Sequence, residues 1–257
     1  MSYHPEALDR RDPKLIAQIL PVLERFNASY FRLAVEGCEH VPATPCLVVG
    51  NHNGGILGPD LFCTLAVLWR KLAPAHPLYA LAHDFAMRQF PSLGRALQKV
   101  GAVTASKANA ARVLQTGGHL LVYPGGDRDA YRTWRRRNHV VISPRCGSVK
   151  VAQAHNVPIV PVVAAGAHRS AYIFGDGEWI ARSLQMKSWA RLERFPLALA
   201  LPWGLAPGPW LPYLPLPFQV RLKFLPPILV DPSDNPAEVA RAIEATMQQT
   251  LTAMVQR

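Results

Sequence analysis

The chain has 257 residues, of which 49% are hydrophobic, and it carries a formal net charge of +11 with an isoelectric point near 9.9. This length and apolar content are enough for one sizeable domain with a full core, and they exclude a low-complexity, disordered chain. A basic surface suits nucleic acid, anionic lipid or a phosphorylated substrate. The placement of aromatic residues and prolines described below favours lipid.

Cysteine usage indicates a reduced, metal-free protein. The four cysteines, at positions 38, 46, 63 and 146, form no CxxC pair, and no His/Cys spacing indicates zinc. We therefore expect buried, reduced thiols in a cytosolic context and no metal. The opening residues, MSYHPEALDRRDPK, lack the apolar core of a signal peptide.

Residues 12–36 form an amphipathic helical segment. Apolar residues recur at three- and four-residue steps from Leu15 to Leu33, which predicts a pair of helices broken near Pro21 or Asn27. Two interpretations are open. The segment lies on a membrane surface, or it is an ordinary helix packed on the core.

The sequence is organised around residues 45–60, PCLVVGNHNGGILGPD. Leu47–Val49 predict a buried strand, and Pro59 opens an apolar helix. His52 lies on the glycine-rich turn between them, at the kind of sheet edge where α/β proteins bind ligands. Histidine takes a proton near neutral pH, and Asp60 is placed to orient its imidazole. The alternative is an ordinary polar loop residue, with Asp60 favouring the helix dipole.

Strands and helices alternate through the rest of the chain. This pattern predicts an α/β fold with a mostly parallel central sheet flanked by helices. We expect a single domain, 1–257, with an α/β core over 40–230 and a C-terminal helix over 235–257. The expected strands are 77–82, 100–105, 119–123, 157–163 and 219–230, and the expected helices are 85–98, 106–115, 147–155 and 235–256.

The stretch Phe195–Phe218 contains no charged residue and many prolines. Its prolines forbid a regular membrane-spanning helix, and open backbone is not tolerated in lipid. Trp203, Trp210 and Tyr213 are residue types that favour the membrane–water boundary. We expect a proline-rich surface loop that dips into one leaflet or covers an acyl tunnel; the alternative is an irregular segment wrapped on the core.

Four blocks together resemble the glycerolipid acyltransferase superfamily, typified by lysophosphatidic acid acyltransferase. They are Asn51-His52 after a hydrophobic strand, the block 101–107 (GAVTASK), the block 122–128 (VYPGGDR) and the block 157–162 (VPIVPV) followed by Gly166. Their order matches that of the family, over residues 40–230. Pro-Gly-Gly in the third block resembles the branch of diacylglycerol-acyltransferase-like and phytyl-ester-synthase-like proteins, in which Arg and an acid follow; Arg128 and Asp129 fit that variant.

The resemblance implies a membrane-associated O-acyltransferase on the cytoplasmic face. Such an enzyme moves a fatty acyl group from an acyl-CoA or acyl-ACP thioester to a lipid hydroxyl, with no cofactor and no nucleic-acid partner. It implies His52 as general base with Asp60 as its partner. The residues expected to bind substrate are Asn53, Gly54, Gly55, Lys107, Tyr123, Pro124, Gly125, Gly126 and Arg128.

The sequence departs from the family pattern at two points. The family has four residues between its histidine and aspartate, whereas here that place holds Leu57 and the nearest acid is Asp60. The resemblance implies a lysophospholipid or glycerolipid acceptor. The third block lacks the family's glutamate and threonine, which motivates the alternative of diacylglycerol or a long-chain alcohol as acceptor. A non-catalytic lipid-binding protein on the same scaffold is a further alternative.

A basic cluster follows the third block. It contains Arg132, Arg135, Arg136 and Arg137 around Trp134, and it either grips coenzyme A phosphates and anionic headgroups or forms a solvated face. No motif involves the other histidines, which we expect to be structural or exposed, including His119 and His168. A nucleotide site is disfavoured because the first strand is followed by neither Gly-Lys-Ser/Thr nor GxGxxG.

Overall fold

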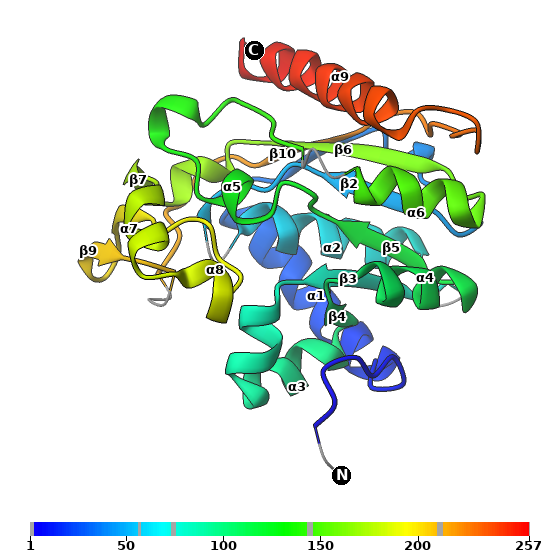
Figure 1. The fold of residues 1–257 in the computed structure, drawn as a ribbon, viewed down its shortest axis with the longest axis horizontal. Coiled ribbons are helices and arrows are strands. Elements are labelled where there is room, and N and C mark those ends of the chain that lie inside the picture. Colours follow the sequence, from blue (N-terminus) through cyan, green and yellow to red (C-terminus); the bar gives the residue numbers. More distant parts are fainter. Residues whose placement is uncertain (1–2, 56–57, 73–75, 143–145, 210–212, 257) are drawn as a thin grey trace.

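A seven-stranded sheet runs through the centre of the molecule with helices on both faces (Figure 1). The computed structural model describes residues 3–55, 58–72, 76–142, 146–209 and 213–256. The strands lie in the order β1-β10-β6-β2-β5-β3-β4. Their bounds are β1 (Ala34–Glu36), β2 (Leu47–Gly50), β3 (Leu78–Ala82), β4 (Ala102–Thr104), β5 (His119–Val122), β6 (Ile159–Ala165) and β10 (Arg221–Phe224).

The central strands are parallel, as the sequence predicts. β2 pairs in parallel with β5 on one side and β6 on the other, and β5 and β4 both pair in parallel with β3. The parallel arrangement ends at β6, because the next strand, β10, runs antiparallel to it. The carboxyl ends of β6, β2, β5, β3 and β4 therefore meet at one edge of the sheet, where α/β folds place their sites.

Nine α-helices and four short 3-10 or π segments are assigned within the described residues. The helices are α1 (Pro13–Ser29), α2 (Pro59–Leu72), α3 (Pro91–Lys99), α4 (Lys107–Gln115), α5 (Gly126–Ala130), α6 (Gly147–His155), α7 (Glu178–Ser183), α8 (Met186–Trp189) and α9 (Pro236–Gln256). The short segments are η1 (Cys38–His40), η3 (Phe85–Gln89), η4 (Trp134–Arg136) and η5 (Ala167–Ser170). Among the described residues, no helix combines the length and apolarity that crossing a membrane requires.

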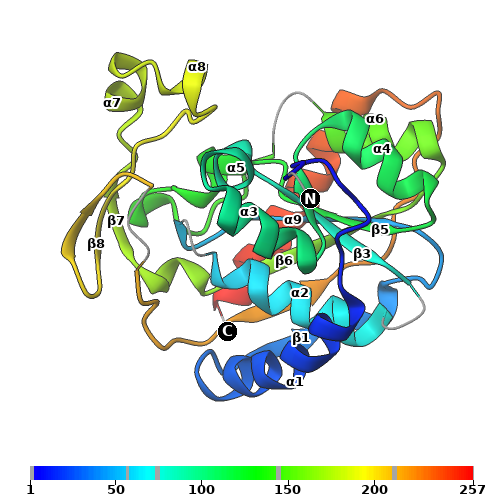
Figure 2. The same cartoon turned by 90° about the horizontal axis from the view of Figure 1, so that it is seen from below.

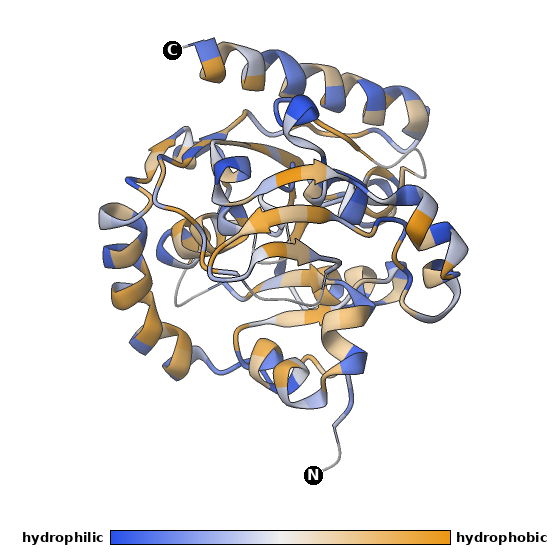
Figure 3. Ribbon diagram, turned by 90° about the vertical axis from the view of Figure 1, so that its left-hand side faces the viewer, coloured by the Kyte–Doolittle hydropathy of each residue, from blue (hydrophilic) through white to orange (hydrophobic). Residues whose placement is uncertain are grey.

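Two apolar cores lie on opposite faces of the sheet. Because side chains alternate along a strand, Leu47 and Val49 face the core built with α4, α6 and α9, while Val48 faces the core built with α1 and α2. Figure 3 shows the central strands in mostly hydrophobic colours and α9 with hydrophilic residues interleaved. A strand that is covered on both faces has a continuous apolar sequence, which is why the residues 47–49 predict a buried strand.

The N-terminal segment forms one helix, α1, so the predicted helix pair is wrong. Asp12 caps it by accepting hydrogen bonds from the backbone N–H groups of Lys14 and Leu15, each 3.0 Å. Pro21 does not break the helix because Pro21 and Ala17, whose carbonyl loses its partner, are both exposed to water.

The apolar side of α1 packs into the core. Ile16 and Leu20 are buried in the cluster that includes α2, as the packing interpretation expects. Val22 and Phe26 remain exposed. Membrane contact by residues 12–36 stays a prediction, although most of the apolar side of α1 packs against the core.

The predicted helix over 85–98 is two elements. η3 ends at Gln89 and α3 begins at Pro91, with Phe90 between them at φ −125° and ψ 82°. A residue before proline is driven out of the helical region, so the continuous helix was wrong at that point. The helix after Ser106 is confirmed, because the Ser106 side chain accepts from the backbone N–H of Asn109 at 3.0 Å.

A second, three-stranded sheet stands at one end of the molecule (Figure 2). It contains β7 (Tyr172–Gly175), β8 (Leu197–Ala200) and β9 (Gly204–Pro207), all antiparallel. The predicted loop over 195–218 is therefore wrong in part, since it contains a β-hairpin. Prolines sit before β8, in the turn and at the end of edge strand β9, where strands tolerate them. Trp210 lies outside the described residues.

Three further expectations are settled. The strand predicted over 219–230 is wrong in length, because β10 ends at Phe224 just before Pro226 and Pro227. The C-terminal helix is confirmed as α9. The four cysteines are thiols that no disulfide joins, and Cys38 alone among them is partly exposed.

Candidate active site

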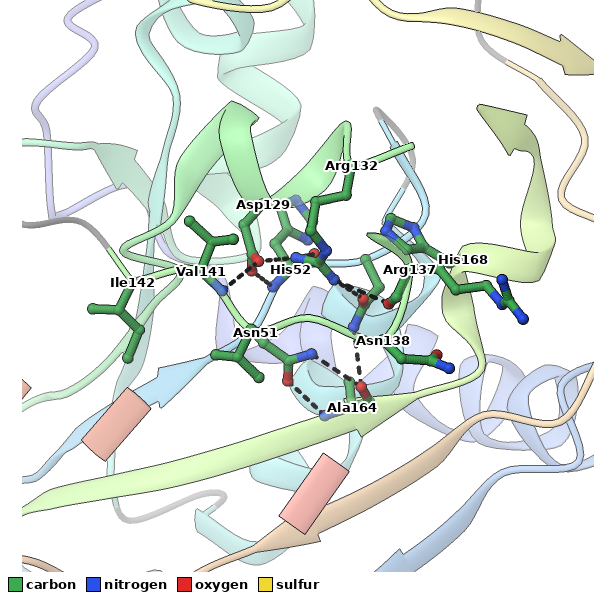
Figure 4. A network of polar contacts seen from close by, with 12 residues as sticks. Asn51, His52, Asp129, Arg132, Arg137, Asn138, Val141, Ile142, Ala164 and His168 are labelled. Carbon is green, nitrogen blue, oxygen red and sulfur yellow. Dashed lines mark hydrogen bonds and ion pairs between the residues drawn. The ribbon is translucent and has the colours of Figure 1, made fainter. Parts of the chain in front are cut away.

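The candidate site lies where three neighbouring strands end. His52 follows β2, Tyr123 follows β5, and His168 follows β6; these strands are adjacent in the order β6-β2-β5. Each strand leaves the sheet through a glycine-containing turn. The sheet therefore positions three segments, distant in sequence, around one histidine (Figure 4).

His52 and Asp60 form a close pair. The Nδ1 atom of His52 lies 3.0 Å from Oδ2 of Asp60, whose side chain is fully buried, while 18% of the His52 side chain is exposed. Asp60 also accepts the backbone N–H of Asn53 at 3.2 Å. With Nδ1 engaged by the carboxylate, Nε2 is the ring nitrogen left to act as an acceptor, which is the tautomer a general base needs.

A glycine explains how the longer His–Asp spacing is accommodated. Asp60 stands in the first turn of α2, and the chain from His52 returns to it through Gly58. A Cβ atom on Gly58 would lie 2.3 Å from Cε1 of His52, and the φ of Gly58 is +27°. The turn needs glycine because the backbone passes directly against the imidazole.

The ring of Tyr123 packs against the imidazole of His52. Its ring centroid lies 4.8 Å from that of His52, at an interplanar angle of 34°. Gly50 makes room for this ring, because a Cβ there would lie 2.5 Å from Cε1 of Tyr123. Burial raises the pKa of the Tyr123 hydroxyl well above its ordinary value, so the group stays protonated. Tyr123 acts here as packing for the imidazole.

A buried ion pair anchors the histidine loop, and sequence reasoning did not identify it as part of the site. Asp129, in the short helix α5, is fully buried and pairs with Arg132, which is 4% exposed. The Asp129 carboxylate also accepts the backbone N–H of His52 and that of Val141, the latter at 3.1 Å. The carboxylate therefore holds the backbone of the candidate base directly.

Arg132 extends the same network to the next residue of the loop. Its Nη2 donates to Oδ1 of Asn53 at 2.5 Å, and its Nη1 lies 3.4 Å from the carbonyl oxygen of His52 (Figure 4). The expectation that Arg132 grips phosphates is wrong, because its guanidinium is buried and already paired. The sequence signal was available as an acid and an arginine three residues apart, the spacing that brings them together on a helix.

Two asparagines fasten the loop to β6. Asn51 donates to the carbonyl oxygen of Ala164 at 3.0 Å and accepts the N–H of Ala164 at 2.8 Å. Asn53 donates to the same carbonyl oxygen at 3.0 Å. Asn53 is 3% exposed, and these contacts with those to Asp60 and Arg132 give it a structural role in the loop.

His168 also belongs to this neighbourhood. Its Nδ1 accepts the backbone N–H of Gly54 at 2.9 Å, and the side chain is buried. Burial, with the nearby charge of Arg132, holds the pKa of His168 well below its ordinary value, so the ring is neutral. The expectation of a structural histidine fits, but no sequence motif connected it with His52.

Because His168 stays neutral when folded, acid should destabilise the protein. The unfolded chain takes up a proton at this histidine near pH 6.5 and the folded chain does not, so stability falls as pH drops below about 6.5, by up to about 1.4 kcal/mol per pH unit. His168→Asn keeps an acceptor for Gly54 and should reduce that slope; part of it remains, because burial lowers the pKa of His119 to about 4. Urea unfolding near neutral pH and one unit below pH 6.5 measures it, with His155→Asn as control. Equal slopes in wild type and His168→Asn would contradict the assignment.

Other predicted substrate residues lie further from His52. Lys107 is exposed at the start of α4, after β4, which lies three strands away from β2. Arg128 is half-exposed and pairs with Glu193. Pro124, Gly125 and Gly126 follow Tyr123 and lead into α5, with Cβ of Asp129 close against Gly125. No group of histidine, cysteine and acidic residues able to hold a metal ion occurs among the residues the structure describes.

Three comparisons place this geometry in context. The Acyltransferase family model matches residues 32–165. The uncharacterized protein Rv0502 of Mycobacterium tuberculosis is 31% identical over 251 residues, which cover 93% of this chain and 66% of that protein. Human diacylglycerol O-acyltransferase 2 is 25% identical over 165 residues, or 60% of this chain and 42% of the human protein.

A solved structure shares the fold. It is the 1-acyl-sn-glycerophosphate (LPA) acyltransferase PlsC from Thermotoga maritima, with a TM-score of 0.54 and 17% identity over 95% of this chain and 83% of that one. The chain spans about two thirds of the length of the mycobacterial relatives it matches. The family match covers His52, Asp60 and the whole Asp129–Arg132 anchor, and the chain belongs to the acyltransferase family.

Proposed function

We propose that this protein transfers a fatty acyl group from a coenzyme A or carrier-protein thioester to a lipid hydroxyl. The observation that carries the proposal is the His52–Asp60 pair, 3.0 Å apart at the carboxyl edge of the sheet, in a chain of the acyltransferase family. The names of the relatives, a diacylglycerol O-acyltransferase and an LPA acyltransferase, support a lipid acceptor. Association with the cytoplasmic face of a membrane is part of the same proposal.

His52 acts as the general base in this mechanism. Its Nε2 removes the proton from the acceptor hydroxyl while the hydroxyl oxygen attacks the thioester carbonyl. Asp60 holds the imidazole tautomer and stabilises the imidazolium that forms. The tetrahedral intermediate then expels the thiolate, which takes up the proton, and an ester and a free thiol remain. The thioester is already activated, so no serine or cysteine nucleophile is needed.

Backbone N–H groups of the glycine turns are candidates to stabilise the oxyanion. Two of them are already engaged, because Gly54 donates to Nδ1 of His168 and Gly126 donates to the carbonyl oxygen of Tyr123 at 3.1 Å. Gly55 and Gly125 therefore remain as the candidate donors among the four glycines that the sequence indicated.

A neutral acceptor, such as diacylglycerol or a long-chain alcohol, is favoured over a lysophospholipid. Three of the cations expected to meet a phosphate are engaged or lie elsewhere: Lys107 lies three strands away, Arg128 pairs with Glu193, and Arg132 is buried against Asp129. An uncharged hydroxyl needs no such cation. Loss of the family's glutamate and threonine in the third block points the same way.

A labelled long-chain acyl-CoA offered with a panel of acceptors tests the proposal. Purified protein should release free thiol and esterify diacylglycerol or hexadecanol at least about tenfold faster, by kcat/KM, than lysophosphatidic acid, because a charged phosphate left without a partner near the site costs more than about 1.4 kcal/mol. Faster transfer to lysophosphatidic acid would overturn the neutral acceptor. Absence of thiol release with every acceptor and donor would favour the non-catalytic lipid-binding alternative.

A further inference from the structure

The sheet formed by β7, β8 and β9 has an unusual side-chain pattern. The residues that face inward are mainly small and buried, among them Ala198, Ala200 and Ala206. The large apolar residues of the strands and of the turn after β8 face outward and are 46–57% exposed. This outer face consists of Tyr172, Phe174, Leu199, Leu201, Trp203 and Leu205.

The outward residues form a continuous row across the strands. Tyr172 pairs in register with Leu199, and Leu199 pairs with Leu205. A sheet with one face in water normally alternates apolar residues inward with polar residues outward, whereas here large apolar residues take the outward positions. Exposed apolar rows of this kind mark surfaces that contact another apolar phase or molecule.

Charge at the rim indicates what covers the outer face. The range 195–218 carries no charged residue. At the β7 edge, the Trp134 ring lies 5.4 Å from that of Tyr172, and the exposed cations Arg135 and Arg136 follow it in η4. An apolar face with tryptophan at its turn and arginine at its rim matches the layered chemistry of a bilayer with anionic headgroups.

The inner side of this sheet adjoins the histidine loop. Ser170, just before β7, donates to the carbonyl oxygen of Gly54 at 3.3 Å and lies 3.4 Å from the hydroxyl of Tyr213. Tyr213 packs with Ala200 and Ala206 under the sheet, and a Cβ on Gly55 would lie 3.1 Å from its hydroxyl. Ser170 and Tyr213 therefore connect the sheet directly with the glycine turn that follows His52.

We propose that the outer face of β7–β9 docks onto an anionic lipid bilayer, with Arg135 and Arg136 at the headgroup level. Docking there would bring the His52 loop close to lipids in the membrane, so the acceptor need not cross water. This functional consequence rests on the proposed acyl transfer. The proposal that the outer face docks onto a bilayer is independent of it. A second copy of this chain and a further protein segment are the competing occupants.

Vesicle sedimentation of the full chain tests the surface. Wild type should bind phosphatidylcholine vesicles that contain phosphatidylglycerol, and Leu199→Ser with Leu205→Ser should lower the partition coefficient by about tenfold or more, because two leucines leave the hydrocarbon. Arg135→Gln with Arg136→Gln should weaken binding to the anionic vesicles and leave weaker binding to pure phosphatidylcholine unchanged. Salt at about 0.5 M should imitate the arginine variant.

Leu229→Ser is the matched control. Leu229 is 81% exposed and follows Ile228, which pairs with Ile159 at the opposite end of β6 from the site. This variant should bind within about twofold of wild type. Equal losses in Leu229→Ser and the double leucine variant, or vesicle binding unaffected by the latter, would overturn the proposal. So would a dimer in light scattering that the leucine variant dissociates in the absence of lipid.

Thiol release from a short-chain, water-soluble acyl-CoA with a soluble alcohol separates docking from catalysis. The leucine variant should keep wild-type activity in that assay while losing vesicle binding. Loss of vesicle binding in a protein that transfers no acyl group at all would leave the docking surface standing and defeat the proposed function. Loss of soluble activity together with an altered circular dichroism spectrum would show that the sheet is structural, which overturns docking as its role.

Discussion

His52→Ala is expected to reduce kcat/KM for acyl transfer by roughly 10²–10⁴-fold, which corresponds to about 3–5 kcal/mol of transition-state stabilisation. The reason is geometric. Asp60 engages Nδ1 at 3.0 Å, so the imidazole is held with Nε2 as its free base, and alanine removes both the base and the partner of a fully buried carboxylate. Initial rates of thiol release with saturating acceptor give the comparison.

The control for this variant is His155→Ala. His155 ends α6 ahead of β6, at the edge of the sheet away from the site, and it is partly exposed. It should retain nearly full activity. Both variants need the same unfolding midpoint within a few degrees, so that the rates report chemistry. Turnover of purified His52→Ala close to that of wild type would remove His52 from the role of base.

The sheet could be predicted from sequence because its strands are buried on both faces. The runs 47–49, 120–122 and 159–165 are apolar without alternation, and each is followed by a turn and a helix or short helical segment. Local capping chemistry was equally readable at Ser106. These elements depend on neighbours in sequence, so a single sequence was sufficient to place them.

The site was predictable only as far as its motif residues. The pairing of His52 with Asp60 depends on the backbone conformation of Gly58, which no periodicity encodes. The anchoring role of Asp129 depends on β5 lying beside β2, since that adjacency brings α5 against the His52 turn. The sequence predicts Arg132 as one cation of a basic cluster that grips anionic groups or faces water, whereas its side chain is buried, and only the fold reveals that burial.

The strands of the second sheet were not predicted from the sequence, for a related reason. A strand with large apolar residues outward and alanines inward gives no polar alternation, so the charge-free stretch around β8 and β9 looked like an irregular loop. The prolines reinforced that interpretation, although they sit at strand margins. The same side-chain pattern that hid the strands is the basis of our proposal that this sheet docks onto a bilayer.

Asp129→Asn is expected to lower the free energy of unfolding by about 3–5 kcal/mol. The substitution leaves the buried guanidinium of Arg132 without its counter-charge, and an unpaired buried charge is far more costly than a lost surface pair. Urea unfolding monitored by tryptophan fluorescence measures the change. The matched control is Arg128→Gln, one residue away, which breaks the half-exposed pair with Glu193 and should cost less than about 1 kcal/mol.

The second arm of this experiment separates charge burial from loop anchoring. Adding Arg132→Met to Asp129→Asn removes the orphaned charge and should recover much of the lost stability, because both partners of the pair are then neutral. Activity should not recover with it, since Asn53 loses its contact with Arg132 and the His52 N–H keeps only an uncharged acceptor. Recovery of both stability and kcat/KM in the double variant would mean that the ion pair only fills space. Recovery of stability alone would identify Asp129 and Arg132 as the residues that position the candidate base.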